Sequence, residues 1–89
     1  MHFTAHARDQ AIARGIDQSE VRRILEKPDG IISDAHEGTR HCYGRAIDPY
    51  TKQERYLIVI YTNLNNFIKV ITVMWTDKGG LRAHGFGNI

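Results

Sequence analysis

The chain has very little cysteine, no strong excess of either charge and no long apolar run. One cysteine, Cys42, stands among 89 residues, so no disulfide forms within the chain and a reducing setting fits the composition. The first ten residues lack the apolar core of a signal peptide, and no apolar run is long enough to span a bilayer. We therefore expect a cytoplasmic protein without a membrane partner.

The charge balance and the spacing of polar residues exclude further classes. Twelve Lys and Arg residues against ten Asp and Glu give a formal net charge of +2, too small by itself to argue for nucleic-acid binding. The histidines and Cys42 match no compact zinc pattern, and no glycine-rich phosphate loop precedes a helix. We predict neither a metal nor another cofactor, and we expect one domain over residues 1–89.

What the chain does contain is a stretch dense in β-branched and aromatic residues, 55–76. Residues 56–61 and 67–75 fit strands in length and composition, and the break between them contains three asparagines that tolerate positive φ. This pattern predicts a β-hairpin. Apolar side chains fall on both faces of each strand, so we expect both faces of the sheet to be covered. A second copy of so small a chain would help to cover them, and we therefore expect a homodimer.

Two helices are predicted in the first third of the chain. The first covers residues 5–14, after Thr4, whose hydroxyl suits an N-cap, and it ends at Gly15. The second follows Asp17, which opens a pattern like a capping box, and it stops at Pro28. The side chains predicted to face the core are Phe3, Ala7 and Ala11 beside the first helix, and Val21, Ile24 and Leu25 in the second.

Residues 31–34 and 39–46 are predicted to form two further strands. Alternation in the second of them places His41, Tyr43 and Arg45 on one face. The element order is then α-α-β-β-β-β, which predicts an α+β fold with two N-terminal helices on one face of a four-stranded antiparallel sheet. Residues 77–89 are rich in glycine and are predicted to be a loose C-terminal tail.

Three features in a fixed order resemble a known family. They are His6-Ala7 followed by Arg14-Gly15-Ile16, an acid-capped helix that ends near Pro28 with a strand pair soon after, and the closing run IKVITVMW at 68–75. Together they resemble the small bacterial domain of unknown function 4258, over about residues 3–76. That family is placed by similarity near the RelE and BrnT toxins, in the wider group of barnase-like and RelE-like ribonucleases.

The resemblance implies a helical pair on an antiparallel sheet, a candidate RNA-cleaving activity of the toxin type, and an antitoxin protein as a partner. Many relatives have no demonstrated activity. This chain also departs from the pattern, because relatives often carry a second basic residue where Gln10 stands. If that position contacts phosphate, this chain has lost one donor.

Cleavage of RNA without a metal needs a base, an acid and cations that stabilise the phosphorane. Histidine suits the proton transfers because its ordinary pKa lies near neutrality, and arginine suits the phosphate because it forms paired hydrogen bonds. We predict that His6, Arg14, His41 and Arg45 face one cleft. The predicted catalytic residues are His6, His41 and Tyr43, and the predicted substrate-binding residues are Arg14, Arg40, Arg45 and Lys69.

Each of these residues also has a purely structural interpretation. A histidine near a helix N-terminus, such as His6, often serves as a hydrogen-bonding group, and Arg14 suits the dipole of a helix C-terminus. Charges on a strand discourage aggregation when that strand is an edge. The alternative hypothesis is therefore a catalytically inert, dimeric binding module that contacts RNA or a protein partner.

Overall fold

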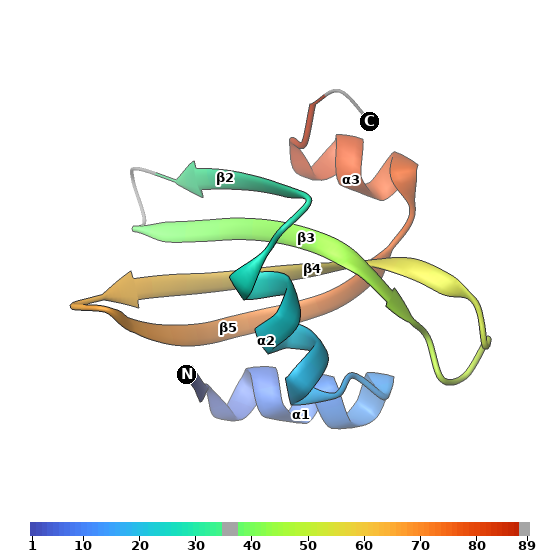
Figure 1. Ribbon diagram of the computed structural model, residues 1–89, viewed down its shortest axis with the longest axis horizontal. Helices are drawn as coiled ribbons and strands as arrows, with labels where there is room; N and C mark the ends of the chain where they lie inside the picture. Colours follow the sequence, from blue (N-terminus) through green and yellow to red (C-terminus); the bar gives the residue numbers. More distant parts are fainter. Residues whose placement is uncertain (35–37, 88–89) are drawn as a thin grey trace.

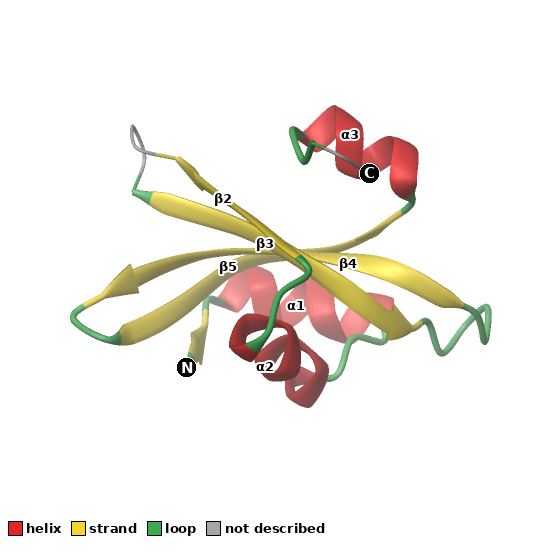
Figure 2. Cartoon of the chain, turned by 45° about the horizontal axis from the view of Figure 1, so that its top comes forward, coloured by secondary structure: helices red, strands yellow, loops and turns green. Residues whose placement is uncertain are grey.

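The computed structural model describes residues 1–34 and 38–87, except for the side chains of residues 33 and 34. The elements in these residues form three layers, with two helices on one face of a sheet and a third helix against the other (Figures 1 and 2). In chain order they are β1 (His2–Phe3), α1 (Ala5–Arg14), α2 (Gln18–Glu26), β2 (Gly30–Asp34), β3 (Thr39–Ile47), β4 (Glu54–Leu64), β5 (Phe67–Thr76) and α3 (Lys78–His84).

The sheet has the strand order β1-β5-β4-β3-β2. Strands β2 to β5 are antiparallel neighbours, which confirms the four predicted strands and the long hairpin. Asn65 and Asn66 turn that hairpin with φ values of 50° and 65°. β1 pairs with β5 in parallel, so the sheet is five-stranded and mixed, and the prediction of a four-stranded antiparallel sheet is wrong on this point. A strand of two residues is too short to leave a pattern in the sequence.

Helices α1 and α2 pack on one face, which we call the helix face of the sheet. Thr4 Oγ1 accepts the N–H of Ala7 at 3.0 Å and begins α1, and Gly15 ends it with φ 65°, where a Cβ is strained. Ala7 and Ala11 are buried as predicted, together with Val21 and Ile24 of α2. They pack against the sheet side chains Cys42, Leu57, Val59, Tyr61, Val70 and Val73.

Helix α3 covers part of the opposite face, which we call the α3 face. Leu81 of α3 is fully buried and Phe86, just beyond it, is 5% exposed, and both pack against Ile58 of β4. This segment was predicted to be a loose tail, and the structure instead contains a helix capped by Asp77, whose Oδ1 accepts the N–H of Gly80 at 2.7 Å. Because α3 supplies cover from within the chain, the two apolar faces no longer argue by themselves for a homodimer.

The glycines at the start of α3 made this helix hard to predict from the sequence, and the structure explains why one of them, Gly80, is a glycine. A Cβ on Gly80 would stand 1.8 Å from the Thr76 hydroxyl oxygen, so the first turn of α3 approaches the end of β5 too closely for a side chain. Of the helices in the described part of the chain, none is long and apolar enough to cross a membrane.

Candidate functional site

The predicted site residues divide between the two faces of the sheet. Cys42 belongs to the helix-face core, so its neighbours His41 and Tyr43 on β3 point to the α3 face. His6 and Arg14 lie on α1, on the other side of the sheet (Figure 2). The prediction that His6, Arg14, His41 and Arg45 face one cleft is therefore wrong.

The physical reason is the size of the side chains on β3. Alternation correctly placed His41, Tyr43 and Arg45 on one face. The helices, however, pack on the other face of β3, where Cys42 and Gly44 are small enough for α2 to approach. Burial raises the pKa of the Cys42 thiol to about 12, so this cysteine is a core residue and no thiolate nucleophile.

Arg14 forms a hydrogen bond with the backbone at the outer edge of β5. β1 pairs with β5 only at Lys69 and Val70, and further along this edge side chains of α1 form hydrogen bonds with the backbone of Val73. Arg14 Nη1 donates to the Val73 carbonyl at 2.7 Å, and the Val73 N–H donates to Gln10 Oε1 at 3.2 Å. These contacts satisfy an edge that would otherwise offer unpaired groups to another strand. The contacts of Arg14 are thus structural, and Gln10 supplies an acceptor that a basic residue cannot.

We expect Gln10→Leu to lower the free energy of unfolding by about 1 kcal/mol, because the Val73 N–H loses its acceptor in a partly buried position. Gln10→Glu keeps an acceptor oxygen at this place and serves as the matched control. Urea unfolding of the three proteins measures the difference. An equal loss in Gln10→Glu and Gln10→Leu would contradict the role of the acceptor.

The remaining predicted residues are scattered. His6 and Arg40 are exposed, and Arg40 shares the helix-face side of β3 with Cys42. Arg45 is more than half exposed, with its Nε 3.5 Å from Asp29 Oδ2. Lys69 is exposed on β5, and alternation with the buried Val70 turns it to the α3 face. Of the predicted set, His41, Tyr43, Arg45 and Lys69 therefore share a face.

The structure adds a residue to that face which the sequence analysis missed. His41 Nδ1 and His84 Nε2 lie 2.6 Å apart, so one imidazole donates a hydrogen bond and the other accepts it. Both rings are half-buried. His84 is the last residue of α3, directly before Gly85. Neither helical periodicity nor the family resemblance marks it, and only the packing of α3 on the sheet brings it to His41.

Aromatic rings hold the histidine pair in place. The His84 ring stacks on Phe86 with centroids 5.6 Å apart, and Phe86 forms a T-shaped pair with Tyr43 with centroids 4.7 Å apart. Tyr43 in turn contacts Tyr56 of β4 at 5.9 Å. A continuous row of rings therefore runs across the α3 face, from His41 at one end to Tyr56 at the other.

Burial lowers the pKa of His84 below its ordinary value near 6.5, and the nearby charge of protonated His41 lowers this pKa further. The shift favours neutral His84 at pH 7. Such a group is suited to accept a proton, whereas a histidine with the ordinary value would be partly protonated already.

The lowered pKa of His84 predicts a pH-dependent stability. The unfolded chain protonates this histidine near pH 6.5 while the folded chain resists it, so the free energy of unfolding should fall as the pH drops from about 6.5 toward the folded-state pKa. Urea unfolding at pH 7.5 and pH 5.0 measures this loss. We expect His84→Gln to lose less stability over the same interval, and an unchanged pH dependence in that variant would contradict the assignment.

In the residues that the structure describes, no group of three or more His, Cys, Asp or Glu side chains is arranged to hold a metal ion. The histidine pair thus defines a site of two titratable side chains and aromatic neighbours on a small α+β domain.

The family model of DUF4258, a domain of unknown function, matches residues 3–75, and the chain therefore belongs to this family. No curated protein and no solved structure matches the chain. The link to RelE and BrnT toxins is not confirmed by these comparisons. The matched residues include His41 and end before α3, so His84 lies in a segment that the family model does not cover.

Proposed function

We propose that this protein is a metal-independent ribonuclease that cleaves single-stranded RNA, with His41 and His84 as its proton-transfer pair. The observation that carries the proposal is the 2.6 Å contact between the two ring nitrogens, made by residues 43 positions apart in the sequence. Two imidazoles with different surroundings can supply a base and an acid near neutral pH.

The reaction assigns one role to each histidine. His84, whose pKa is lowered, takes the proton from the ribose 2′-hydroxyl as that oxygen bonds to the adjacent phosphorus. His41 gives a proton to the 5′-oxygen as the bond between that oxygen and phosphorus breaks. The products are a 2′,3′-cyclic phosphate and a free 5′-hydroxyl. A substrate that enters must replace the hydrogen bond between the rings with bonds to its own oxygens.

Cations and rings on the same face support this role. Lys69 lies on β5 and Arg45 on β3, and both side chains are exposed on the face that carries the histidines. Positive charge there favours the phosphate of the substrate and the charge that develops on it. Tyr43 positions Phe86, and through it His84, so Tyr43 acts on orientation rather than on the proton itself.

A catalytically inert binding module is the second candidate. The specific observation in its favour is that the two histidines bond to each other and thereby fasten α3 to the sheet, which is a sufficient structural reason for both. Such a module would contact RNA or a protein partner without breaking a bond. In the toxin interpretation, an antitoxin protein would be the natural partner.

The test is incubation of the purified protein with a single-stranded RNA that contains all dinucleotide steps, in excess EDTA. We expect cleavage products that end in a 2′,3′-cyclic phosphate, identified by mass spectrometry. Binding of the RNA without any product would overturn the ribonuclease proposal and favour the inert module. Cleavage that disappears in EDTA would also overturn it, because the proposed chemistry uses no metal.

A further inference from the structure

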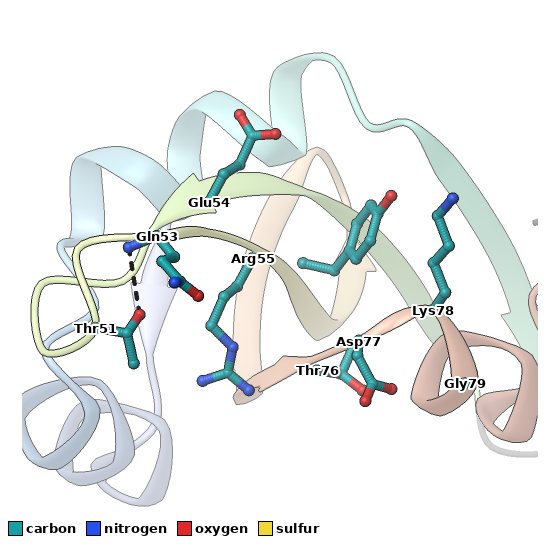
Figure 3. A pocket seen from close by; sticks show the side chains of 9 residues that line it. Thr51, Gln53, Glu54, Arg55, Thr76, Asp77, Lys78 and Gly79 are labelled. Carbon is teal, nitrogen blue, oxygen red and sulfur yellow. Dashed lines mark hydrogen bonds between the residues drawn. The ribbon is translucent and has the colours of Figure 1, made fainter.

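A groove of about 580 Å³ lies at the corner where β4 and β5 separate (Figure 3). β5 ends at Thr76, which pairs with Tyr56 of β4. β4 begins at Glu54, two residues before Tyr56, so its first two residues have no partner on β5. The chain leaves β5 for α3 at this point. One wall of the groove is therefore the start of β4 and the other is the junction between β5 and α3, with the lining completed by Thr51 and Gln53.

Arg55, whose side chain is fixed by an ion pair, lines the groove on the β4 side. Arg55 Nη1 donates to Asp48 Oδ2 at 2.9 Å, and its guanidinium lies 5.8 Å from the centre of the Trp75 ring. The Arg55 side chain remains 37% exposed, whereas Asp48 is buried. A guanidinium held from one side keeps its other N–H groups available, and that is the arrangement in which arginine recognises phosphate.

The opposite wall supplies a second cation, the exposed Lys78. Figure 3 shows Arg55 and Lys78 extending in opposite directions from separate walls of the groove, so that they mark two places for negative charge. Two carboxylates also line it. Asp77 Oδ1 is engaged as the cap of α3, whereas Glu54, on the other side of its strand from Arg55, is exposed and can accept from a ligand. A ligand for this groove therefore carries an anionic group together with donors that a carboxylate can accept. An apolar or purely anionic molecule does not match it as well.

We propose that this groove binds one nucleotide of an RNA strand. Lys78 contacts its phosphate, the ring of Tyr56 packs against the base, and Glu54 accepts from the base or the ribose. Arg55, on the other side of β4, contacts the neighbouring phosphate of the same strand. The volume suits a ligand of this size. Aromatic side chains that stack on a base and cations that follow the backbone are the recurrent means of binding single strands.

The groove lies close enough to the histidine pair for one RNA strand to reach both. This part of the inference rests on the proposed ribonuclease function. Tyr56 pairs with Arg45, four residues along β3 from His41, which corresponds to about 13 Å. The row of rings from Tyr56 through Tyr43 to His84 joins the two places. The groove would thus take a nucleotide near the cleaved bond and not the cleaved phosphate itself.

Titration of a fluorescent hexanucleotide with 2′-O-methyl riboses, which cannot be cleaved, tests the inference at several salt concentrations. Lys78→Gln should weaken binding about tenfold and should flatten the slope of log K against log salt by about 0.7, the value for one lost phosphate contact on a single strand. Arg8→Gln removes one positive charge from the exposed side of α1, across the sheet from α3, and serves as the control, with an expected change of less than about twofold. Equal effects of the two variants would overturn the subsite.

Two further experiments test the role of Arg55 and distinguish an RNA strand from a free nucleotide as the ligand. Arg55→Lys keeps a cation beside Asp48 but loses the paired N–H groups, so we expect weaker hexanucleotide binding and an unchanged melting temperature. Uridine 5′-monophosphate, added as a competitor, should displace the hexanucleotide only weakly. Tight binding of the mononucleotide that Lys78→Gln removes and that does not displace the hexanucleotide would assign the groove to free nucleotides and overturn the inference.

These outcomes are independent of the cleavage assay. If RNA is bound but never cleaved, the ribonuclease proposal fails, while a selective loss of binding in Lys78→Gln still supports the groove as a nucleotide subsite. If RNA is cleaved and Lys78→Gln binds it like the unchanged protein, the subsite alone fails.

Discussion

Replacement of Val59 by aspartate should leave the protein unfolded or nearly so at room temperature. Val59 lies in β4, the middle strand of the sheet, between Cys42 of β3 and Val73 of β5, and its side chain is fully buried under α1 and α2. An unpaired carboxylate there costs about 4 kcal/mol or more. The whole domain has a stability of about 4–13 kcal/mol at this length. The loss is therefore a large fraction of the total.

The measurement is urea unfolding followed by the signal of Trp75, the single tryptophan of the chain. Ile47→Asp is the matched control, because Ile47 is also a β-branched strand residue but is 60% exposed at the end of β3. We expect that control to shift the midpoint only slightly. A Val59→Asp protein with the midpoint of the unchanged chain would show that β4 is not the centre of the core.

The helices and strands in residues 5–76 were predictable because helix caps, turns and alternation depend on residues that are close in the sequence. Thr4, Gly15 and Asp17 have the capping and terminating geometry that their residue types suggested. The asparagines of the hairpin adopt the positive φ values that the turn needs. The apolar character of both faces of β4 correctly indicated that both faces are covered. In each case the cause and the consequence lie within a few residues of each other.

The errors concern long-range arrangement. Alternation in β3 gave the correct set of side chains on one face, but no local rule says which of the two faces receives α1 and α2. That choice depends on Cys42 and Gly44 making room for Ile24, a contact between segments about 20 residues apart. The predicted cleft failed for this reason, and Arg14 bonds to the edge of β5 instead.

The C-terminal segment, predicted to be a loose tail, shows a different limit of prediction from sequence. Glycine lowers helix propensity by about 1 kcal/mol per residue, so the sequence KGGLRAH does not indicate a helix. Its stability comes from tertiary contacts, namely the burial of Leu81 and Phe86 against Ile58. His84 could not be placed in a site before α3 itself was placed. A functional residue in a segment of low intrinsic propensity is thus accessible only through the packed structure.

His84→Gln and His41→Gln should each lower the rate of RNA cleavage by about 10²-fold or more, while binding of the RNA stays nearly constant. The reason is the loss of a proton-transfer group, because glutamine keeps hydrogen-bonding capacity but does not titrate. His6→Gln is the matched control. His6 is exposed on α1, on the far side of the sheet, and its replacement should leave the rate unchanged. Single-turnover cleavage in EDTA and anisotropy titrations give the two quantities separately.

The pH profile of these variants distinguishes chemistry from a structural role of the pair. A base and an acid produce a bell-shaped profile, and its acidic limb reports the base. Because burial and His41 lower the pKa of His84, that limb should lie below the ordinary histidine value near 6.5 in the unchanged protein and should vanish in His84→Gln. A purely structural role would lower the rate through a reduced melting temperature and would leave the profile in place. A loss of cleavage in His6→Gln but not in His84→Gln would move the site to the helix side of the sheet and overturn the proposed pair.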